Sequence, residues 1–331
     1  MRAVEAGWRA RAAERHRGAR QGVRDETAEP PGEPGEQTPP EVSAPGVQPQ
    51  GWSYGNDSRV VKRINATYPA NDNILMRLGQ LDGGCTATLV GRRLVLTAMH
   101  CVLDGTGYPT NGHVYAPRKD VADLPWGSEA STARWFDGAF FDNGCNISYT
   151  AANRETCGRY DWVLLRLGTS AWNANGGNWA SMGYWVPGSS GWYVWNNGYP
   201  SCGYPESPAG CVQDAAYGEN VGHTPFNVRG PDQIGENSIF NSANDVSPGH
   251  KGGPAFSPNY PDSAGGPYLL GIETNQMCGV CSLGEAPVND TTYPMMSRRM
   301  TTTLAGLIND KKRYIRKQCS ELDSSLPRAW W

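Results

Sequence analysis

The stretch Leu94-Val-Leu-Thr-Ala-Met-His-Cys101 decides the fold, because an apolar run ends there at a histidine that is followed by a cysteine. Its first four residues have the length and composition of a buried strand, which would deliver His100 at its end. Cys85 lies on the preceding strand, so a Cys85–Cys101 disulfide would staple this hairpin beneath the imidazole. A lone histidine is usually structural, but a histidine framed in this way is a candidate for chemistry.

Two further segments place chemically useful groups beside apolar or glycine-rich runs. In Tyr160-Asp-Trp-Val-Leu-Leu-Arg-Leu167, Asp161 directly precedes an apolar strand. Alone it would be a turn residue or a buried acceptor, but with His100 it is a candidate to hold the imidazole in the correct tautomer. In Asp245-Val-Ser-Pro-Gly-His-Lys-Gly-Gly-Pro254, the glycines let the backbone turn tightly and present N–H groups toward one point, as an oxyanion hole requires.

In this order the three segments resemble the His, Asp and Ser motifs of the chymotrypsin-fold serine proteases, and the closer resemblance is to the glutamyl endopeptidase (V8-like) branch. It covers about residues 52–310 and includes Tyr54-Gly-Asn-Asp-Ser-Arg59, Asn65-Ala-Thr-Tyr-Pro69, Cys85-Thr-Ala-Thr-Leu-Val90, Gly198-Tyr-Pro200 and Gly271-Ile272. The resemblance implies His100 as general base, Asp161 as its orienter, and an oxyanion hole formed by Gly249 and the backbone amide of Lys251. It implies no cofactor and no metal.

The same resemblance predicts an all-β fold of two antiparallel six-stranded β-barrels, over about 60–175 and 180–300, followed by a C-terminal helix at about 303–317. The composition agrees, since 41 Gly, 25 Pro and 12 Trp against 6 Phe, with many short apolar runs, favour strands. Predicted strands include Ile74–Leu78, Thr86–Val90, Leu94–Thr97, Trp162–Leu167, Trp192–Trp195 and Tyr268–Ile272. On the helix, one face carries Leu304, Leu307, Ile308 and Ile315.

The first 51 residues are predicted to be a disordered tail. Seven arginines up to Arg24 precede a Pro- and Glu-rich stretch, which cannot bury enough apolar surface to offset chain entropy. The tail is either a propeptide or tether, or simply solvated. No apolar core of a secretory signal is visible, although the cysteine content favours an oxidising, extracellular compartment.

Eight of the nine cysteines fall into pairs of sequence neighbours, and we expect them to form disulfides: Cys85 with Cys101, Cys145 with Cys157, Cys202 with Cys211, and Cys278 with Cys281. Zinc binding is disfavoured because the short Cys278–Cys281 spacing has no second pair. The remaining thiol, Cys319, is either buried under the terminal helix or cross-links two chains.

Lys251 stands where the family pattern Asp-x-x-x-Gly-x-Ser-Gly-(Gly/Ser)-Pro has its nucleophilic serine. An ammonium cannot attack a carbonyl, and a neutral amine would form a stable amide, so turnover would stop. Ser247, four residues upstream, would serve only if the loop changed register. We therefore expect a catalytically impaired homologue that binds peptide or protein.

Two alternatives stay open. One is an active endopeptidase, acting through Ser247, through a shifted register or through a serine in the natural parent, and the other is a structural or adhesion module. The net charge of −3 and the lack of a long apolar run argue against nucleic-acid and membrane partners, and we expect a monomer.

The residue expected to set substrate specificity also departs from the family pattern. Glu273 follows Gly271-Ile272, where the V8-like branch has a histidine that reads an acidic side chain. Three roles are open for Glu273. It would line an acidic pocket that favours Lys or Arg, or it would close that pocket by pairing with Lys251. The third role is that of a solvated strand residue. Glutamyl specificity is therefore not carried over.

Overall fold

The computed structural model describes residues 59–67, 75–145, 154–168, 183–184, 194–202, 207–208, 210–219, 239–242, 249–257, 267–276 and 295–324. The predicted N-terminal tail, Ser247, and the Cys278–Cys281 pair lie outside the described residues. Cys319 lies on a described helix, but its side chain does not belong to the described part.

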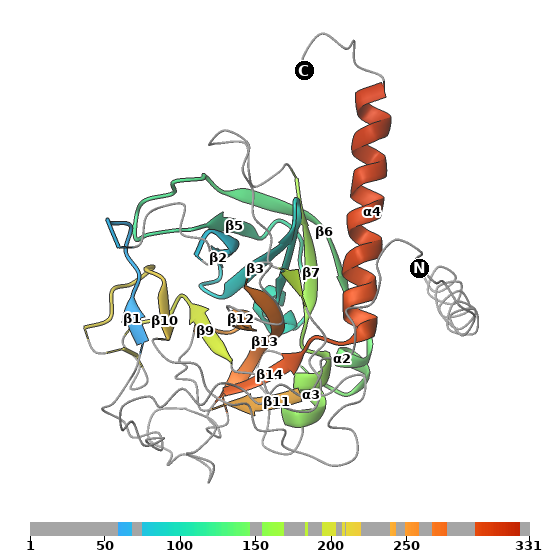
Figure 1. Ribbon diagram of the computed structural model, residues 1–331. Helices are drawn as coiled ribbons and strands as arrows, with labels where there is room; N and C mark the ends of the chain where they lie inside the picture. Colours follow the sequence, from blue (N-terminus) through green and yellow to red (C-terminus); the bar gives the residue numbers. More distant parts are fainter. Residues whose placement is uncertain are drawn as a thin grey trace, which may run out of the picture. The chain divides into compact units, whose positions relative to one another are not determined.

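Six strands close into an antiparallel barrel in the order β2-β3-β4-β7-β6-β5 (Figure 1). They are β2 (Leu78–Leu81), β3 (Thr86–Gly91), β4 (Leu94–Thr97), β5 (Val114–Pro117), β6 (Glu129–Phe136) and β7 (Val163–Leu167). Every residue of β4 is buried, as its unbroken apolar run predicts. The barrel interior holds Leu89, Val95, Tyr115 and Leu165.

The second sheet has eight strands, in the order β1-β10-β9-β12-β13-β14-β11, with β8 pairing with β13. Its strands are β1 (Arg59–Val61), β8 (Gly183–Tyr184), β9 (Trp195–Gly198), β10 (Tyr217–Glu219), β11 (Ile239–Ser242), β12 (Pro254–Ser257), β13 (Tyr268–Gln276) and β14 (Met295–Arg299). The predicted fold class is confirmed, with one difference in detail. The described residues show an eight-stranded sheet rather than a second closed six-stranded barrel, because β1 and the parallel strand β8 add to it.

One predicted strand position was wrong. A 3-10 turn, η1 (Leu75–Arg77), occupies most of the predicted strand at Ile74–Leu78, and β2 begins only at Leu78. Leu75 and Leu78 are both about 1% exposed, and their spacing of three matches one 3-10 turn, which brings both side chains to the same side. Of the strand predicted at Trp192–Trp195, residues 192 and 193 lie outside the described residues, and Trp195 is the first residue of β9, which runs to Gly198.

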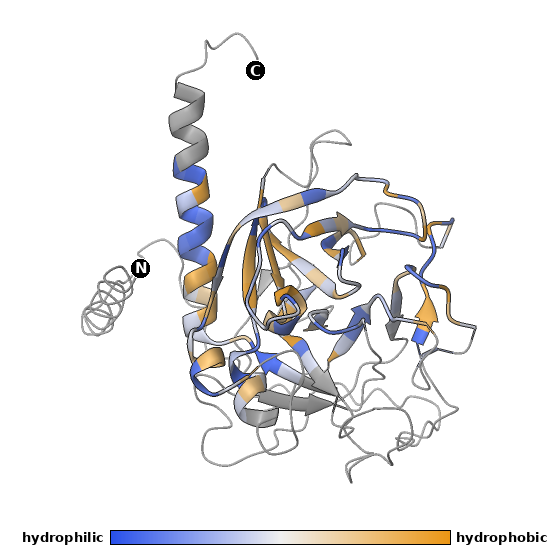
Figure 2. Ribbon diagram, turned by 180° about the vertical axis from the view of Figure 1, so that it is seen from behind, coloured by the Kyte–Doolittle hydropathy of each residue, from blue (hydrophilic) through white to orange (hydrophobic). Residues whose placement is uncertain are grey.

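The C-terminal helix α4 spans Thr302–Ser324 and is longer than predicted. Leu304, Ile308 and Ile315 are buried in a cluster that also contains residues of the barrel and of the second sheet, and Leu307 packs against that cluster. Figure 2 shows mostly hydrophobic colours in the first turns of α4 and mostly hydrophilic colours in the turns that follow, with a hydrophobic patch among them. The ammonium of Lys311 lies 4.7 Å from the ring centroid of Trp135 on β6, which adds a cation–π contact.

Three shorter helical segments complete the described secondary structure: η2 (Met99–Val102), α2 (Ala139–Asp142) and α3 (Arg154–Tyr160). Among the described residues, none of the helices combines the length and the apolar character that crossing a bilayer requires. Three of the four predicted disulfides are present: Cys85–Cys101, Cys145–Cys157 and Cys202–Cys211.

Candidate active site

Strand pairing brings the histidine and the aspartate together. In the antiparallel register of β4 and β7, Thr97 lies opposite Val163, so the end of one strand meets the start of the other. His100 follows β4 within η2, and Asp161 precedes β7. Both are buried, with 8% and 0% of their surfaces exposed. Two segments about sixty residues apart in the sequence therefore converge on one point.

The Asp161 carboxylate holds His100 through two contacts. The backbone N–H of His100 donates to Oδ1 at 2.9 Å, and Nδ1 of the ring lies 2.7 Å from Oδ2. A carboxylate in this place fixes the tautomer with the proton on Nδ1, which leaves Nε2 as the reactive nitrogen. These contacts are the ones that the predicted roles of His100 as base and Asp161 as its orienter require.

The glycine-rich loop at 249–253 is fastened to the barrel by Thr86, the first residue of β3. Its hydroxyl donates to the carbonyl of Gly249 at 2.7 Å and accepts the N–H of Tyr199 at 2.9 Å. Its backbone N–H donates to the carbonyl of Lys251 at 3.0 Å. One barrel residue thus sets the position of the loop relative to His100.

Two glycines make this loop conformation accessible. Gly249 has φ +92° and Gly252 has φ +81°, in the left-handed region that side chains other than glycine enter at a cost. A Cβ on Gly252 would lie 2.0 Å from Oγ1 of Thr97, and one on Gly249 would lie 2.2 Å from the carbonyl oxygen of Tyr199. Sterics therefore require glycine at both positions.

Strand β13 also fixes the loop, through two backbone hydrogen bonds. The N–H of Gly252 donates to the carbonyl of Glu273 at 2.7 Å, and the N–H of Glu273 donates to the carbonyl of Gly253 at 2.9 Å. Within the described residues, the N–H groups of Gly249 and Lys251 donate no backbone hydrogen bond. These are the two donors that the family resemblance implies for an oxyanion hole.

Lys251 is partly buried and lies beside acidic groups. Burial lowers the pKa of its ammonium below the ordinary value, while the charges of Glu273 and Asp161 act in the opposite direction. Glu273 is fully buried, so its interpretation as a solvated strand residue was wrong. The charge of Glu273 favours the protonated form of Lys251.

His250, the residue before Lys251, has a structural place. It is fully buried, and its Nδ1 lies 3.1 Å from the amide nitrogen of Asn196, which donates to it. Burial, with a smaller contribution from the charge of Arg59, holds the pKa of His250 well below its ordinary value. The ring is therefore neutral at neutral pH.

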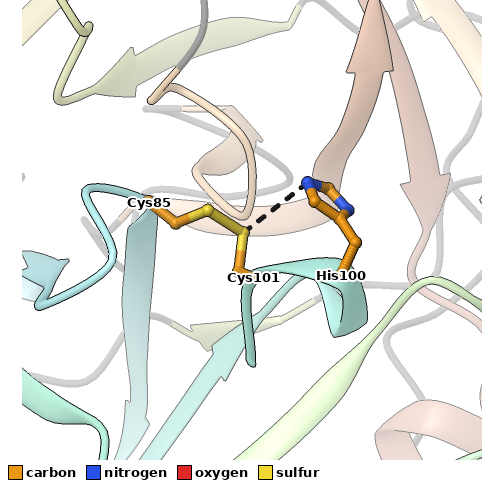
Figure 3. Close-up of side chains that lie close together, drawn as sticks. All are labelled: Cys85, His100 and Cys101. Atoms are coloured by element: carbon orange, nitrogen blue, oxygen red, sulfur yellow. Dashed lines mark hydrogen bonds between the residues drawn. A yellow bond between two sulfur atoms is a disulfide. The ribbon is translucent and has the colours of Figure 1, made fainter. Parts of the chain in front are cut away.

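The Cys85–Cys101 disulfide lies directly beside His100, as Figure 3 shows. Nε2 of His100 is 3.7 Å from Sγ of Cys101, and the same sulfur is 3.8 Å from the carbonyl oxygen of Lys251. The sequence predicted the disulfide but not its contact with the ring. It also did not single out Thr86, since a threonine on an apolar strand carries no signal of a role in loop placement.

The chain is similar to known proteins in sequence and in fold. No family model matches the chain. The chain is 24% identical to the glutamyl endopeptidase of Bacillus licheniformis over 229 residues, which is 68% of this chain and 61% of that relative. The chain therefore matches less than two thirds of the length of that curated protein.

Solved structures with a similar fold include a Glu endopeptidase in complex with MPD, at 16% identity and a TM-score of 0.50, with 78% of this chain and 98% of that chain covered. A thermostable serine protease, AL20, matches at 18% identity and a TM-score of 0.46, over 70% of this chain and 93% of the other. The likeness to the Glu endopeptidase structure shows that the chain has the trypsin-like serine protease fold.

Proposed function

We propose that the chain is a serine endopeptidase homologue that binds a peptide or protein chain and does not hydrolyse it. The observation that carries this proposal is Lys251 in the nucleophile position of a loop whose other features fit the family. The glycines Gly249 and Gly252 keep their positive φ angles, and the His100–Asp161 pair is assembled. Only the hydroxyl is missing from the position that the motif assigns to it.

Neither protonation state of Lys251 supports turnover. The ammonium has no lone pair with which to attack a carbonyl. The neutral amine, which the lowered pKa makes more accessible, would give an amide whose cleavage is as difficult as that of the original peptide bond. A base without a hydroxyl partner retains, through the oxyanion hole and binding alone, roughly 10³–10⁴-fold acceleration over water.

Substrate-like binding is supported by the parts that remain. In a serine protease the oxyanion loop receives a carbonyl oxygen through two backbone N–H groups. Here that loop is fixed by Thr86 on one side and Glu273 on the other. A carbonyl of a bound peptide would find a rigid, preorganised set of donors, which reduces the entropy cost of binding.

The family resemblance implies a specificity pocket at Glu273, and the buried carboxylate of this residue would favour a basic side chain there. A buried carboxylate is costly unless a cation lies near it. Lys251 supplies part of that attraction, and a bound Lys or Arg side chain would supply more. If Lys251 alone satisfies Glu273, the pocket is closed and no preference for basic peptides is expected.

Three disulfides in the described part of the chain support export to an oxidising, extracellular compartment. We propose a secreted monomer that works without cofactor, with peptide or protein as its partner rather than nucleic acid or membrane.

Peptide binding is tested by fluorescence polarisation with the purified chain and labelled peptides that differ only in a central Arg, Glu or Ala. Binding of the Arg peptide is expected, and it should weaken about tenfold in Glu273→Gln, which removes one charge interaction. Lys251→Ala is the matched control, since it removes the opposing charge and should retain binding. Cleavage of the peptides by the wild-type chain, or no affinity for any of them, would overturn the proposal.

A further inference from the structure

The two sulfurs of the disulfide next to His100 have unequal surroundings. Cys85 is partly exposed, after the turn that joins β2 to β3, whereas Cys101 is about 9% exposed and buried within η2. A soluble thiol therefore reaches Cys85 more easily than Cys101. The sulfurs of both cysteines and a ring nitrogen of His100 lie within 4.8 Å of one another.

The buried sulfur faces a group that stabilises it as a leaving group. Nε2 of His100 lies 3.7 Å from Sγ of Cys101, as the dashed line in Figure 3 marks. Asp161, at 2.7 Å from Nδ1, stabilises positive charge on the imidazole. An imidazolium beside a sulfur stabilises its thiolate, and a better leaving thiolate accelerates thiol–disulfide exchange.

We propose that Cys85 is a site of S-thiolation by low-molecular-weight thiols, with Cys101 leaving toward His100. Nε2 of His100 takes the proton of the small thiol, the resulting thiolate attacks Sγ of Cys85, and the Cys85–Cys101 bond breaks. The electron pair of that bond goes to Sγ of Cys101, to which Nε2 returns the proton. The products are a mixed disulfide on Cys85 and a free thiol on Cys101, so one disulfide replaces another and no separate oxidant is needed.

The sulfur of Cys101 also lies 3.8 Å from the carbonyl oxygen of Lys251. The exchange stands apart from peptide binding, because it needs only the disulfide, the imidazole and Asp161. Failure of either idea leaves the other intact.

The chain carries two internal controls. Cys145 and Cys157 are both buried, so their disulfide should be closed to any small thiol. Cys202 and Cys211 are both partly exposed, and in the described residues no histidine contacts their sulfurs. The second pair therefore matches Cys85–Cys101 in access and differs in the imidazole.

In the test, the folded full chain is treated with reduced glutathione, and free thiols are then trapped with iodoacetamide. Peptide mass spectrometry locates the cysteines that carry glutathione and those that carry the alkyl group. We expect glutathione on Cys85 and the alkyl group on Cys101, formed faster than any change at Cys202–Cys211. His100→Gln, which fills similar space without positive charge, should slow this reaction about tenfold and leave Cys202–Cys211 unchanged. Near-ultraviolet circular dichroism establishes that the variant is folded.

Three outcomes would overturn the inference. They are glutathione on Cys101 instead of Cys85, equal rates at the two exposed disulfides, and a folded His100→Gln chain that reacts as fast as the wild type.

Discussion

Asp161 holds His100 through both of its carboxylate oxygens, one at 2.9 Å from the backbone N–H and one at 2.7 Å from Nδ1 of the ring. This relationship joins the start of β7 to the turn after β4. It is therefore a structural link within the barrel as well as the means of orienting the imidazole.

Asp161→Ala is expected to lower the free energy of unfolding by about 3 kcal/mol, because it leaves two buried donors of His100 without their acceptor. Asp161→Asn keeps one oxygen acceptor and should lose about half as much. Urea unfolding followed by tryptophan fluorescence measures both. Asp123→Ala, at an exposed position, is the control and should be close to neutral. A loss at Asp161 no larger than that of the control would contradict the structural role.

Thr86→Val removes the hydroxyl that positions the glycine-rich loop and keeps the shape of the side chain. The carbonyl of Gly249 and the N–H of Tyr199 both lose a partner, which should cost about 2–3 kcal/mol of stability. Faster amide hydrogen exchange in residues 249–253 is the local measurement. The control is Thr132→Val, at an exposed hydroxyl on β6, which should change neither the stability nor the exchange rate. If amide exchange in residues 249–253 were the same in Thr86→Val as in the wild type, Thr86 would not be holding the loop.

Lys312 makes stability depend on pH. Burial against the barrel, with a smaller contribution from Arg316, lowers its pKa from 10.5 to about 8. Between pH 8 and 10.5 the unfolded chain binds more protons at this site than the folded one, so this residue makes stability rise with pH across that window. Lys312→Met should abolish this contribution and stabilise the chain at pH 7.

The measurement is the difference in urea midpoint between wild type and Lys312→Met at several pH values. The variant's advantage should shrink as the pH increases from 8 to 10.5. Lys317→Met, at an exposed position on the same helix, provides the baseline for removing one charge. An advantage that does not vary with pH would rule out a depressed pKa at Lys312.

Much of the fold could be predicted from local pattern. The apolar run Leu94–Thr97 coincides with β4, since turns flank it on both sides. The disulfides were predictable because each joins cysteines that lie close in the sequence, such as Cys202 and Cys211 at a separation of 9. In contrast, β1 pairs with β10, Arg59 opposite Glu219, and no local pattern encodes a pairing between such distant strands.

Some features of the candidate site could likewise be predicted from the sequence, and others could not. His100 and Asp161 were recognisable because each stands at the end of an apolar strand, and strand pairing then brings them together. The burial of Glu273 was not predictable, because a glutamate is usually exposed and only the packing of β12 and β14 around β13 decides otherwise. The contact between His100 and the sulfur of Cys101 depends on side-chain directions that residue spacing does not specify.

The central claim is that Lys251, in the position of the nucleophile, is the one residue that prevents this chain from acting as a serine hydrolase. Labelling with a fluorophosphonate probe tests it most directly, in wild type, Lys251→Ser and Lys251→Ala side by side. We predict no labelling of the wild type or of Lys251→Ala, and labelling at the introduced serine that is lost when His100→Ala is added. A labelled wild-type chain, or a folded Lys251→Ser chain that the probe does not modify, would contradict the claim.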